Sequence, residues 1–593
     1  MTDTEAEWIR VPVGADAARW STRSRCRTVL LVVHNVTSAT RLLDVLPLFR
    51  DDLRVQLLAT STGSSPFQHG VPELLTRVGV PVLPWEQALR TPVNLAISAS
   101  FGGQLNALPG KLIVLSHGAG YNKRLSHRGT QGDTGGHRGT QGDTAVPAPV
   151  FGLSREWLLA DGAPIADAMV LSHDEQLDRL RAACPEAAHT AVLAGDPCYD
   201  RILAALPHRE RFRRALGVTE GQRLVLLNST WNPESLFGDG GRDNTPEGTD
   251  APDDVLPHLL PRLTAELPVD THRLAAVLHP NIWHGHGPGQ VRTWLDRSRR
   301  AGLTLVDPLT EWCQALIAAD AVIGDFGSVS YYAAALGTPV LLGAAPLTVL
   351  GTDSPVADFI RQAPRLDPCA PLPPQLDALV EQHRPLPGPA RLTSSVPGRS
   401  AALLRRACYR LVGIAEPDEP ALLDPLPLPP YRPPRRTAPL RVLTRLLAAG
   451  DIAVTRHADP RYEPPGEGAV HTAVHEDTLD PGRLAQADVI LQYAAADDPR
   501  LGPPEEWAAR TLQRWPHCAL AAYVTSPATC TAALRDGRTV RLTGSARGAD
   551  PAAYAAALHA WLAGGKSLDE LCASGLTVRT GQVAHRVTVS PPE

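Results

Sequence analysis

Short apolar runs alternate with helical patterns through the first part of the chain. Each run is predominantly apolar and too short for a buried helix, and a segment with helical periodicity follows it. Parallel strands buried on both faces have this pattern, because helices cover both sides of their sheet. The runs occupy residues 28–33, 54–59, 94–98, 111–116, 167–171 and 191–194. We therefore predict a Rossmann-like α/β domain over residues 25–210, after an N-terminal extension over residues 1–24.

The same alternation recurs in the second part of the chain. Apolar runs at 223–228, 272–279, 303–306, 321–324 and 339–343 predict a second Rossmann-like domain over residues 211–414. Repeated prolines over residues 415–439 cannot continue a helix or an inner strand, which indicates a stiff linker. Further apolar runs and a helical pattern at 551–562 predict a small α/β domain over residues 440–593, to which the residues assign no role.

Charge and cysteine content argue against several classes of protein. The 593 residues carry 57 basic and 62 acidic side chains, a net charge of −5, so no overall positive field exists to hold nucleic acid. The nine cysteines are scattered without a CxxC pair, so we expect neither a disulfide framework nor a zinc cluster. The acidic N-terminus and the lack of an apolar run of about 18 residues predict neither a signal peptide nor a membrane span. We expect a cytoplasmic protein.

A tandem repeat marks one loop of the first predicted domain. The octapeptide His-Arg-Gly-Thr-Gln-Gly-Asp-Thr occurs at 127–134 and again at 137–144, without an apolar residue to anchor it. We therefore expect a mobile loop over residues 124–148. Two interpretations stay open, namely replication slippage in a tolerant loop, and a lid or acceptor-binding segment beside a site.

A histidine and two glycines follow the predicted strand at 111–116. His117, Gly118 and Gly120 stand where a parallel strand delivers its loop to the ligand-binding edge of a sheet. A histidine there can take a proton from a hydroxyl near neutral pH, and glycines let a substrate approach the backbone. The pattern is compatible with a catalytic base, and equally with a histidine that caps the loop through its ring nitrogens.

Polar residues also follow three strands of the second predicted domain. Thr230 follows the first strand, His279 follows another, and the segment from Asp325 to Ser330 follows a third and opens a predicted helix. Free backbone N–H groups at a helix start, with small hydroxyls such as Ser328, suit a pyrophosphate. The alternative is ordinary N-capping of that helix by an Asp or Ser side chain.

Five pieces of the chain, in this order, resemble the CDP-glycerol glycerophosphotransferase family of wall teichoic acid synthesis. The resemblance covers about residues 90–410. In the first predicted domain, His117-Gly118 with Lys123 is similar to a His-Gly-Thr block ending in lysine, and residues 195–200 are similar to a Gly-x-Pro-Arg-x-Asp turn. In the second, residues 229–231 are similar to Pro-Thr-Trp-Arg, and His279-Pro280 is similar to a His-Pro motif. The run from Asp307 to Ser328 is similar to a family segment that ends in Asp-Tyr-Ser-Ser. The resemblance implies a GT-B fold, in which two Rossmann-like domains face each other across a cleft that holds the active site.

The resemblance also implies a reaction and a role for each matching residue. A polyol phosphate of the glycerol phosphate type would pass from a CDP-linked donor to a lipid-linked or glycan acceptor in cell-envelope polymer synthesis. No metal or cofactor is implied, and the acceptor implies peripheral contact with the inner face of the plasma membrane. His117 would be the general base and His279 the second catalytic residue, holding the donor pyrophosphate. The remaining candidates are Thr230, Asp325, Gly327, Ser328 and Ser330 on the donor side, and Gly118 and Lys123 on the acceptor side.

Four positions depart from the family pattern. Cys198 and Asn232 stand where the family has arginines, Gly327 where it has a serine, and Tyr332 where it has an aspartate. Because two positive charges are missing, either other groups compensate or the donor differs. Two other functions stay open. One is a nucleotide-sugar enzyme, either a glycosyltransferase or a UDP-sugar 2-epimerase. The helix predicted at 331–336 counts against this function, because it has no carboxylate to bind the hydroxyls of a ribose. The other is a non-catalytic binding or scaffold protein.

Overall fold

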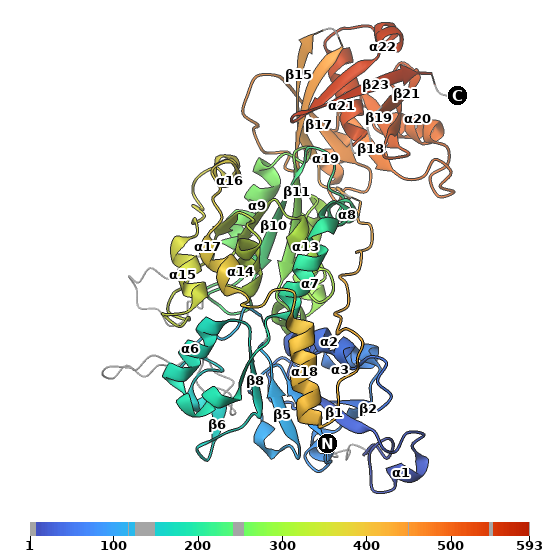
Figure 1. The fold of residues 1–593 in the computed structure, drawn as a ribbon. Helices are drawn as coiled ribbons and strands as arrows, with labels where there is room; N and C mark the ends of the chain where they lie inside the picture. The colour runs from blue at the N-terminus through green and yellow to red at the C-terminus, as the bar shows by residue number, and fades with distance from the viewer. Residues whose placement is uncertain are drawn as a thin grey trace, which may run out of the picture.

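The computed structural model describes residues 8–116, 118–124, 149–240, 254–433, 435–448, 450–544 and 550–591. Three parts follow one another along the long axis of the molecule, two of them α/β and the third, at the C-terminus, a barrel (Figure 1). His117 lies outside the described residues, and so does the loop predicted at 124–148 with its repeat, apart from Arg124.

The first part is a seven-stranded parallel sheet with helices on both faces. Strand β1 is buried along most of its length, with Val29 and Leu31 in the core on one face and Leu30 and Val32 in the core on the other. This burial explains the uninterrupted apolar run. In spatial order the strands are β3 (Val82–Leu83), β2 (Val55–Ser61), β1 (Arg27–Val33), β4 (Leu95–Ser98), β5 (Lys111–Val114), β8 (Ala168–Leu171) and β9 (Ala191–Leu193).

Helices of the first part begin where local sequence signals place them. Helix α2 follows β1 through a capping box, in which Asn35 Oδ1 accepts from Ser38 N at 2.9 Å and Ser38 Oγ accepts from Asn35 N at 3.1 Å. The helices are α1 (Ala17–Trp20), α2 (Val36–Val45), α3 (Val71–Val78), α4 (Trp85–Ala88), α5 (Arg155–Leu158) and α6 (Asp174–Ala183), with a small hairpin of β6 (Leu159–Ala160) and β7 (Ala163–Pro164).

The second part is a five-stranded parallel sheet, also covered on both faces. Its strands, in spatial order, are β12 (Thr304–Leu305), β11 (His272–Leu278), β10 (Arg223–Ser229), β13 (Ala321–Gly324) and β14 (Val340–Leu342). Its helices are α7 (Pro197–Ala205), α8 (Arg209–Ala215), α9 (Leu256–Glu266), α10 (Pro280–Gly285), α11 (Pro288–Trp294), α12 (Asp296–Arg300), α13 (Trp312–Ala318), α14 (Ser328–Ala335), α15 (Pro355–Gln362), α16 (Leu372–Glu381) and α17 (Pro387–Leu392). The prediction of two Rossmann-like sheets is therefore confirmed.

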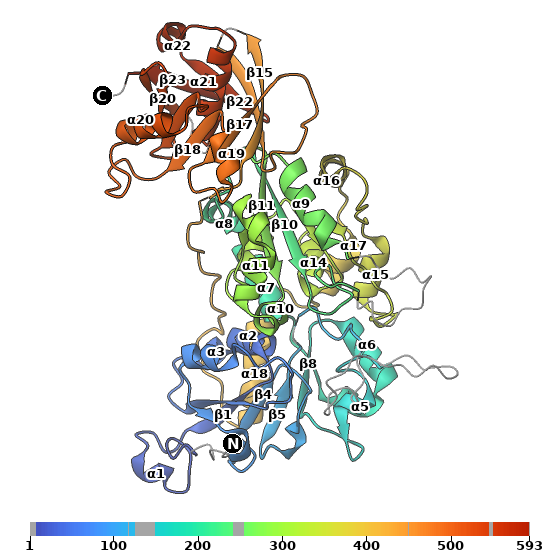
Figure 2. The same cartoon turned by 180° about the vertical axis from the view of Figure 1, so that it is seen from behind.

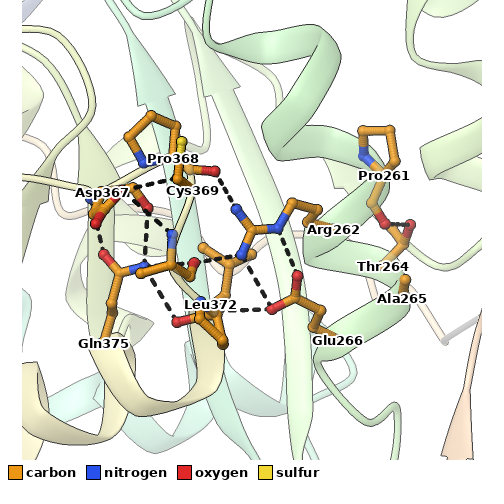
Figure 3. A network of polar contacts seen from close by, with 12 residues as sticks. Pro261, Arg262, Thr264, Ala265, Glu266, Asp367, Pro368, Cys369, Leu372 and Gln375 are labelled. Carbon is orange, nitrogen blue, oxygen red and sulfur yellow. Dashed lines mark hydrogen bonds and ion pairs between the residues drawn. The ribbon is translucent and has the colours of Figure 1, made fainter. Parts of the chain in front are cut away.

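A polar network fixes the outer helices of the second part to each other (Figure 3). Arg262 on α9 pairs with Glu266 at 2.5 Å and donates to the carbonyl oxygens of Pro368 and Ala370. Glu266 also accepts from Leu372 N at 2.7 Å, at the start of α16. These bonds satisfy the backbone C=O groups of Pro368 and Ala370 and the N–H group of Leu372, which lie outside the regular hydrogen bonds of helices and strands.

Helix α18 (Ser400–Val412) returns the chain to the first part. Its side chains Leu404, Ala407 and Cys408 are buried in the core beneath the first sheet. Residues 420–433 then form neither helix nor strand as the chain runs back past the second part, where Arg432 N donates to Ala215 O at 2.8 Å. Helix α18 also contacts α7, so it touches both α/β parts. Among the described residues, no helix is long and apolar enough to cross a membrane.

The prediction of a small α/β domain at the C-terminus is wrong, because residues 440–591 form a closed nine-stranded barrel. Around the barrel its strands are β15 (Leu440–Ala448), β16 (Asp451–His457), β22 (Leu576–Thr580), β23 (Val583–Ser590), β21 (Thr539–Gly544), β20 (Thr529–Leu534), β19 (Leu520–Val524), β18 (Val489–Tyr493) and β17 (Ala469–His475). The helices are α19 (Pro481–Ala485), α20 (Pro504–Arg514), α21 (Ala552–Ala563) and α22 (Leu568–Ser574).

Helix α21 explains why the apolar runs here do not build an open layered sheet. The helix is apolar on all sides, its residues from Ala552 to Leu558 are buried, and it packs against strands on several sides of the barrel. A helix of this kind has to be enclosed rather than laid on one face of a sheet. Closure depends on the pairs β15–β17 and β16–β22, whose partners are far apart in the sequence.

The barrel is fixed to the second part by a buried ionic network. Arg456 on β16, which is 1% exposed, donates to Asp270 Oδ1 at 2.7 Å and to Asp550 Oδ2 at 2.8 Å. Asp270 precedes β11 and therefore lies at the amino edge of the second sheet. The barrel accordingly lies at the opposite end of the second part from the first part, as both views show (Figure 2).

Candidate functional site

Loops from the two sheets meet at the carboxyl ends of their strands. In the second sheet the strand order reverses between β10 and β13, and open α/β sheets bind ligands at such a point. Thr230 directly follows β10, and Asp325 directly follows β13. The loop after β5 of the first sheet reaches both segments, because Lys123 Nζ donates to Thr230 Oγ1 at 3.1 Å and Ala119 N donates to Ser328 Oγ at 3.1 Å. This junction is the candidate site.

Asp325 organises the loops of the site. It is 0% exposed, and its Oδ2 accepts from Thr230 N at 2.8 Å, from Ser229 Oγ at 3.1 Å and from Leu236 N at 3.1 Å. Its Oδ1 accepts from Gly327 N at 2.9 Å. Burial raises the pKa of this carboxyl, against these hydrogen bonds and the charge of Lys123. Asp325 thus fixes the positions of Thr230 and of Gly327 at the start of α14.

Lys123 brings a partly buried positive charge to the site. Its ammonium lies 5.3 Å from the ring centroid of Phe326 and 5.7 Å from that of Trp231, in addition to its bond to Thr230. Burial lowers the pKa of Lys123 to about 8, although Asp325 and Glu234 raise it. Below that pH the site presents a cation whose hydration is largely replaced by protein, which strengthens its attraction for an anion.

No side chain among the described residues caps the start of α14. Gly327 is its N-cap residue, and neither Asp325 nor Ser328 accepts from the first turn of the helix. The alternative prediction, that an Asp or Ser side chain caps this helix, is therefore wrong for Asp325 and Ser328. The N–H groups of this first turn lie beside Lys123 and Thr230, and such groups attract anions.

Ser330 and His279, two of the residues predicted to bind the nucleotide-linked donor, have local contacts that differ from those of Thr230 and Asp325. Ser330 lies inside α14, is fully buried, and donates to Asn228 Oδ1 at 3.1 Å, so it joins the helix to β10. His279 is the N-cap of α10, and its Nδ1 accepts from Asn281 N at 3.1 Å. A neutral His279 ring therefore carries its proton on Nε2. His279 follows β11, the strand next to β10, so it is one strand removed from Thr230.

Gly118 allows the close approach of the two α/β parts. Its φ is +95°, and a Cβ there would lie 2.5 Å from Ser328 Oγ. A side chain would therefore strain the backbone and also push the loop away from α14.

We expect Gly118→Ala to lower the melting temperature more than Gly162→Ala does. Gly162 has a φ of +77° and open space around it, so its variant carries backbone strain without a collision. The collision with Ser328 adds about 1–3 kcal/mol of destabilisation. Scanning calorimetry of both variants measures the difference. Equal losses in the two variants would contradict the close contact.

Two departures from the family pattern belong to one buried cluster. Tyr332 Oη donates to Asp196 Oδ2 at 2.5 Å, and Cys198 lies in the same core. The cluster includes Arg41 of α2, which pairs with Asp44 at 3.1 Å. Sequence reasoning missed Arg41, because nothing distinguishes it from the many other arginines. Its side chain, on a helix of the first part, lies beside Cys198 and Tyr332 of the second part.

The part of the chain that the structure describes contains no group of three or more His, Cys, Asp or Glu side chains able to hold a metal ion. A scan against protein-family models found no match, and a search of curated proteins found none either.

A search of solved structures found similar chains at low identity. The wall teichoic acid polymerase TagF, determined with CDPG, aligns with a TM-score of 0.40 and 11% identity over 66% of this chain and 90% of that chain. The UDP-GlcNAc 2-epimerase from Methanocaldococcus jannaschii aligns with a TM-score of 0.38 and 12% identity over 64% and 99%. Anabaena Alr3699/HepE in complex with UDP aligns with a TM-score of 0.32 and 12% identity over 65% and 100%. Function has to be argued from the residues of this chain.

Proposed function

We propose that this protein is a transferase that moves a polyol phosphate from a CDP-linked donor to a hydroxyl acceptor. The observation that carries the proposal is the contact of Lys123 with Thr230 beside the uncapped start of α14. A cation, a hydroxyl and free backbone N–H groups are the groups that a pyrophosphate needs. They come together at the point of the second sheet where α/β folds bind nucleotides.

Lys123 supplies a charge that the sequence comparison leaves missing. Cys198 and Asn232 replace two arginines of the family pattern, and Asn232 Nδ2 donates to Glu234 Oε2 at 2.7 Å instead of offering a positive charge. Lys123 is within hydrogen-bonding distance of the loop after β10. In this proposal Lys123 therefore acts on the donor side of the reaction, and the acceptor-side role implied by the resemblance moves to other residues.

The proposed reaction is an in-line attack of the acceptor hydroxyl on the donor phosphorus. His117 takes the hydroxyl proton, and Lys123 with the first N–H groups of α14 neutralises the charge on the departing CMP. His279 holds the pyrophosphate from the neighbouring strand. Little covalent chemistry is left to the protein, so positioning and charge neutralisation are the main catalytic terms. The acceptor is a lipid-linked or glycan hydroxyl, reached from the inner face of the membrane.

Isothermal titration calorimetry with CDP, CMP and UDP tests the proposal. We expect the wild type to bind CDP, and His279→Ala to bind it about tenfold more weakly, because one hydrogen bond to the pyrophosphate is lost. His517→Ala, at an exposed position of the barrel part, is the matched control and should bind like the wild type. Tighter binding of UDP than of CDP would favour a nucleotide-sugar enzyme, and binding of no nucleotide would favour a scaffold protein.

A further inference from the structure

The side chain of Lys123 reaches from the first part into the second. Lys123 belongs to the loop after β5 of the first sheet, yet its ammonium donates to Thr230 Oγ1 at 3.1 Å. The ammonium also lies over the rings of Phe326 and Trp231, 5.3 Å and 5.7 Å from their centroids, and both rings belong to the second part. Distances below about 6 Å allow a cation–π attraction. A cation of the first part is therefore held by a hydroxyl and two rings of the second.

The two rings are fixed in different ways. Phe326 is 2% exposed and belongs to the core of the second part, whereas Trp231 is 41% exposed. An indole that is so far exposed has several rotamers open to it, so core packing does not hold it beside Lys123. The place of Trp231 over the ammonium requires a further contact.

Phe67 provides this contact from the first part. Its ring centroid lies 5.0 Å from that of Trp231, at an interplanar angle of 67°, which is an edge-to-face arrangement. Phe67 belongs to the loop between β2 and α3, and it also packs against α10, where a Cβ at Gly285 would lie 3.4 Å from Phe67 Cε1. Phe67, Trp231 and Lys123 thus form a chain of contacts across the junction of the two parts.

We propose that Trp231 and Phe67 are positioning residues that hold the ammonium of Lys123 at the donor-binding loops. Thr230 accepts one N–H of the ammonium, the electron-rich ring of Trp231 attracts the cation, and Phe67 keeps the indole in place. Since Lys123 and Phe67 belong to the first part and Trp231 to the second, this arrangement exists only while the two parts are docked. The consequence for donor binding rests on the proposed function, whereas the contact itself does not.

The titration of Lys123, followed by NMR, tests the proposal without a ligand. The chain has three lysines, Lys111, Lys123 and Lys566, so isotope-labelled lysine gives three side-chain signals, and Lys123→Met identifies that of Lys123. Because a ring stabilises the charged amine, we expect Trp231→Leu to lower the pKa of Lys123 from about 8 by about half a unit to one unit. Trp231→Phe keeps a ring and should lower this pKa by less. Phe67→Leu should lower it as well, because the indole loses its support.

Trp294→Leu is the matched control. Trp294 is 48% exposed on α11, and among the described residues no Lys or Arg side chain lies over its ring. This variant should leave the pKa of Lys123 at its wild-type value. Lys111 is an internal reference, because its hydrogen bond to Asp167 raises its pKa and is remote in sequence from every substitution. Its signal should titrate alike in all the variants.

The direction of the shift decides between two roles of the indole. A raised pKa of Lys123 in Trp231→Leu would overturn the proposal, because it would show that the ring only shields the amine from water. An unchanged pKa would overturn it too, and an unchanged pKa in Phe67→Leu would exclude the supporting role of Phe67.

Titration of CDP separates this proposal from the proposed function. We expect Trp231→Leu to bind CDP about two- to fivefold more weakly than the wild type. Equal affinities would overturn the role of Trp231 in donor binding. If the wild type binds no CDP, the proposed transferase fails, while the NMR titration still decides whether Trp231 and Phe67 hold Lys123.

Discussion

Replacing Lys123 by methionine is expected to weaken CDP binding by about 10- to 150-fold. The ammonium donates to Thr230 and lies 5.3 Å from the ring centroid of Phe326, just before α14. A charge-assisted hydrogen bond contributes about 1.5–3 kcal/mol, which corresponds to this range of affinity. Asp325 keeps its hydrogen bonds from Thr230, Ser229, Leu236 and Gly327 in the variant, so the fold of the loops should survive. Calorimetric titration of CDP measures the effect.

The pH dependence of CDP binding provides the control for this variant. With a pKa of about 8, Lys123 is charged below that pH and neutral above it, so the affinity of the wild type should fall as the pH rises past about 8. Lys123→Arg keeps its charge and should show no such fall. Affinity that is equal in Lys123→Met and wild type, or a fall that persists in Lys123→Arg, would show that this ammonium does not hold the donor.

Replacing Arg456 by methionine is expected to destabilise the protein by about 3–5 kcal/mol. The substitution leaves Asp270 and Asp550 without the guanidinium that both contact, and an unpaired buried carboxylate is costly. Arg436 lies close enough to lower the pKa of Asp550, but among the described residues Arg456 is the one ion-pair partner of Asp270. Scanning calorimetry should show the loss in the transition that includes the barrel.

Arg579→Met is the matched control for the barrel. Arg579 also forms a two-pronged ion pair with an aspartate, Asp451, on a neighbouring strand, but it lies on the surface. Water replaces a lost surface pair, so we expect no measurable change in stability. A loss in Arg456→Met as small as that in Arg579→Met would mean that the barrel is not held to the second part by this network.

Local sequence signals were sufficient for the strands of the two parallel sheets except β3 (Val82–Leu83), a two-residue edge strand that was not predicted. The apolar runs predicted at 28–33 and 223–228 correspond to β1 (Arg27–Val33) and β10 (Arg223–Ser229), because burial on both faces leaves an uninterrupted apolar pattern. The helix predicted at 331–336 begins earlier, at Ser328, since no side-chain cap marks its start. For that reason Ser330, predicted as a loop hydroxyl, lies within the helix and bonds to Asn228.

Sequence reasoning was insufficient wherever the structure depends on distant pairing. The helix predicted at 551–562 is present as α21, yet the sheet around that helix closes through strand pairs that no local pattern records. The same limit applies to the sites. Lys123 was assigned to the acceptor side by its position in a motif, whereas its contact with Thr230 depends on how the two sheets pack.

The sequence by itself determined the kind and order of the elements and the residues that follow each parallel strand, because hydrophobic periodicity and strand ends are local properties. Only the tertiary structure decided which of those residues meet. It brought Lys123 to Thr230 and joined Arg456 to Asp270. These contacts join residues separated by a hundred positions or more, and their geometry follows from the packing of whole sheets and helices, which no short stretch of sequence specifies.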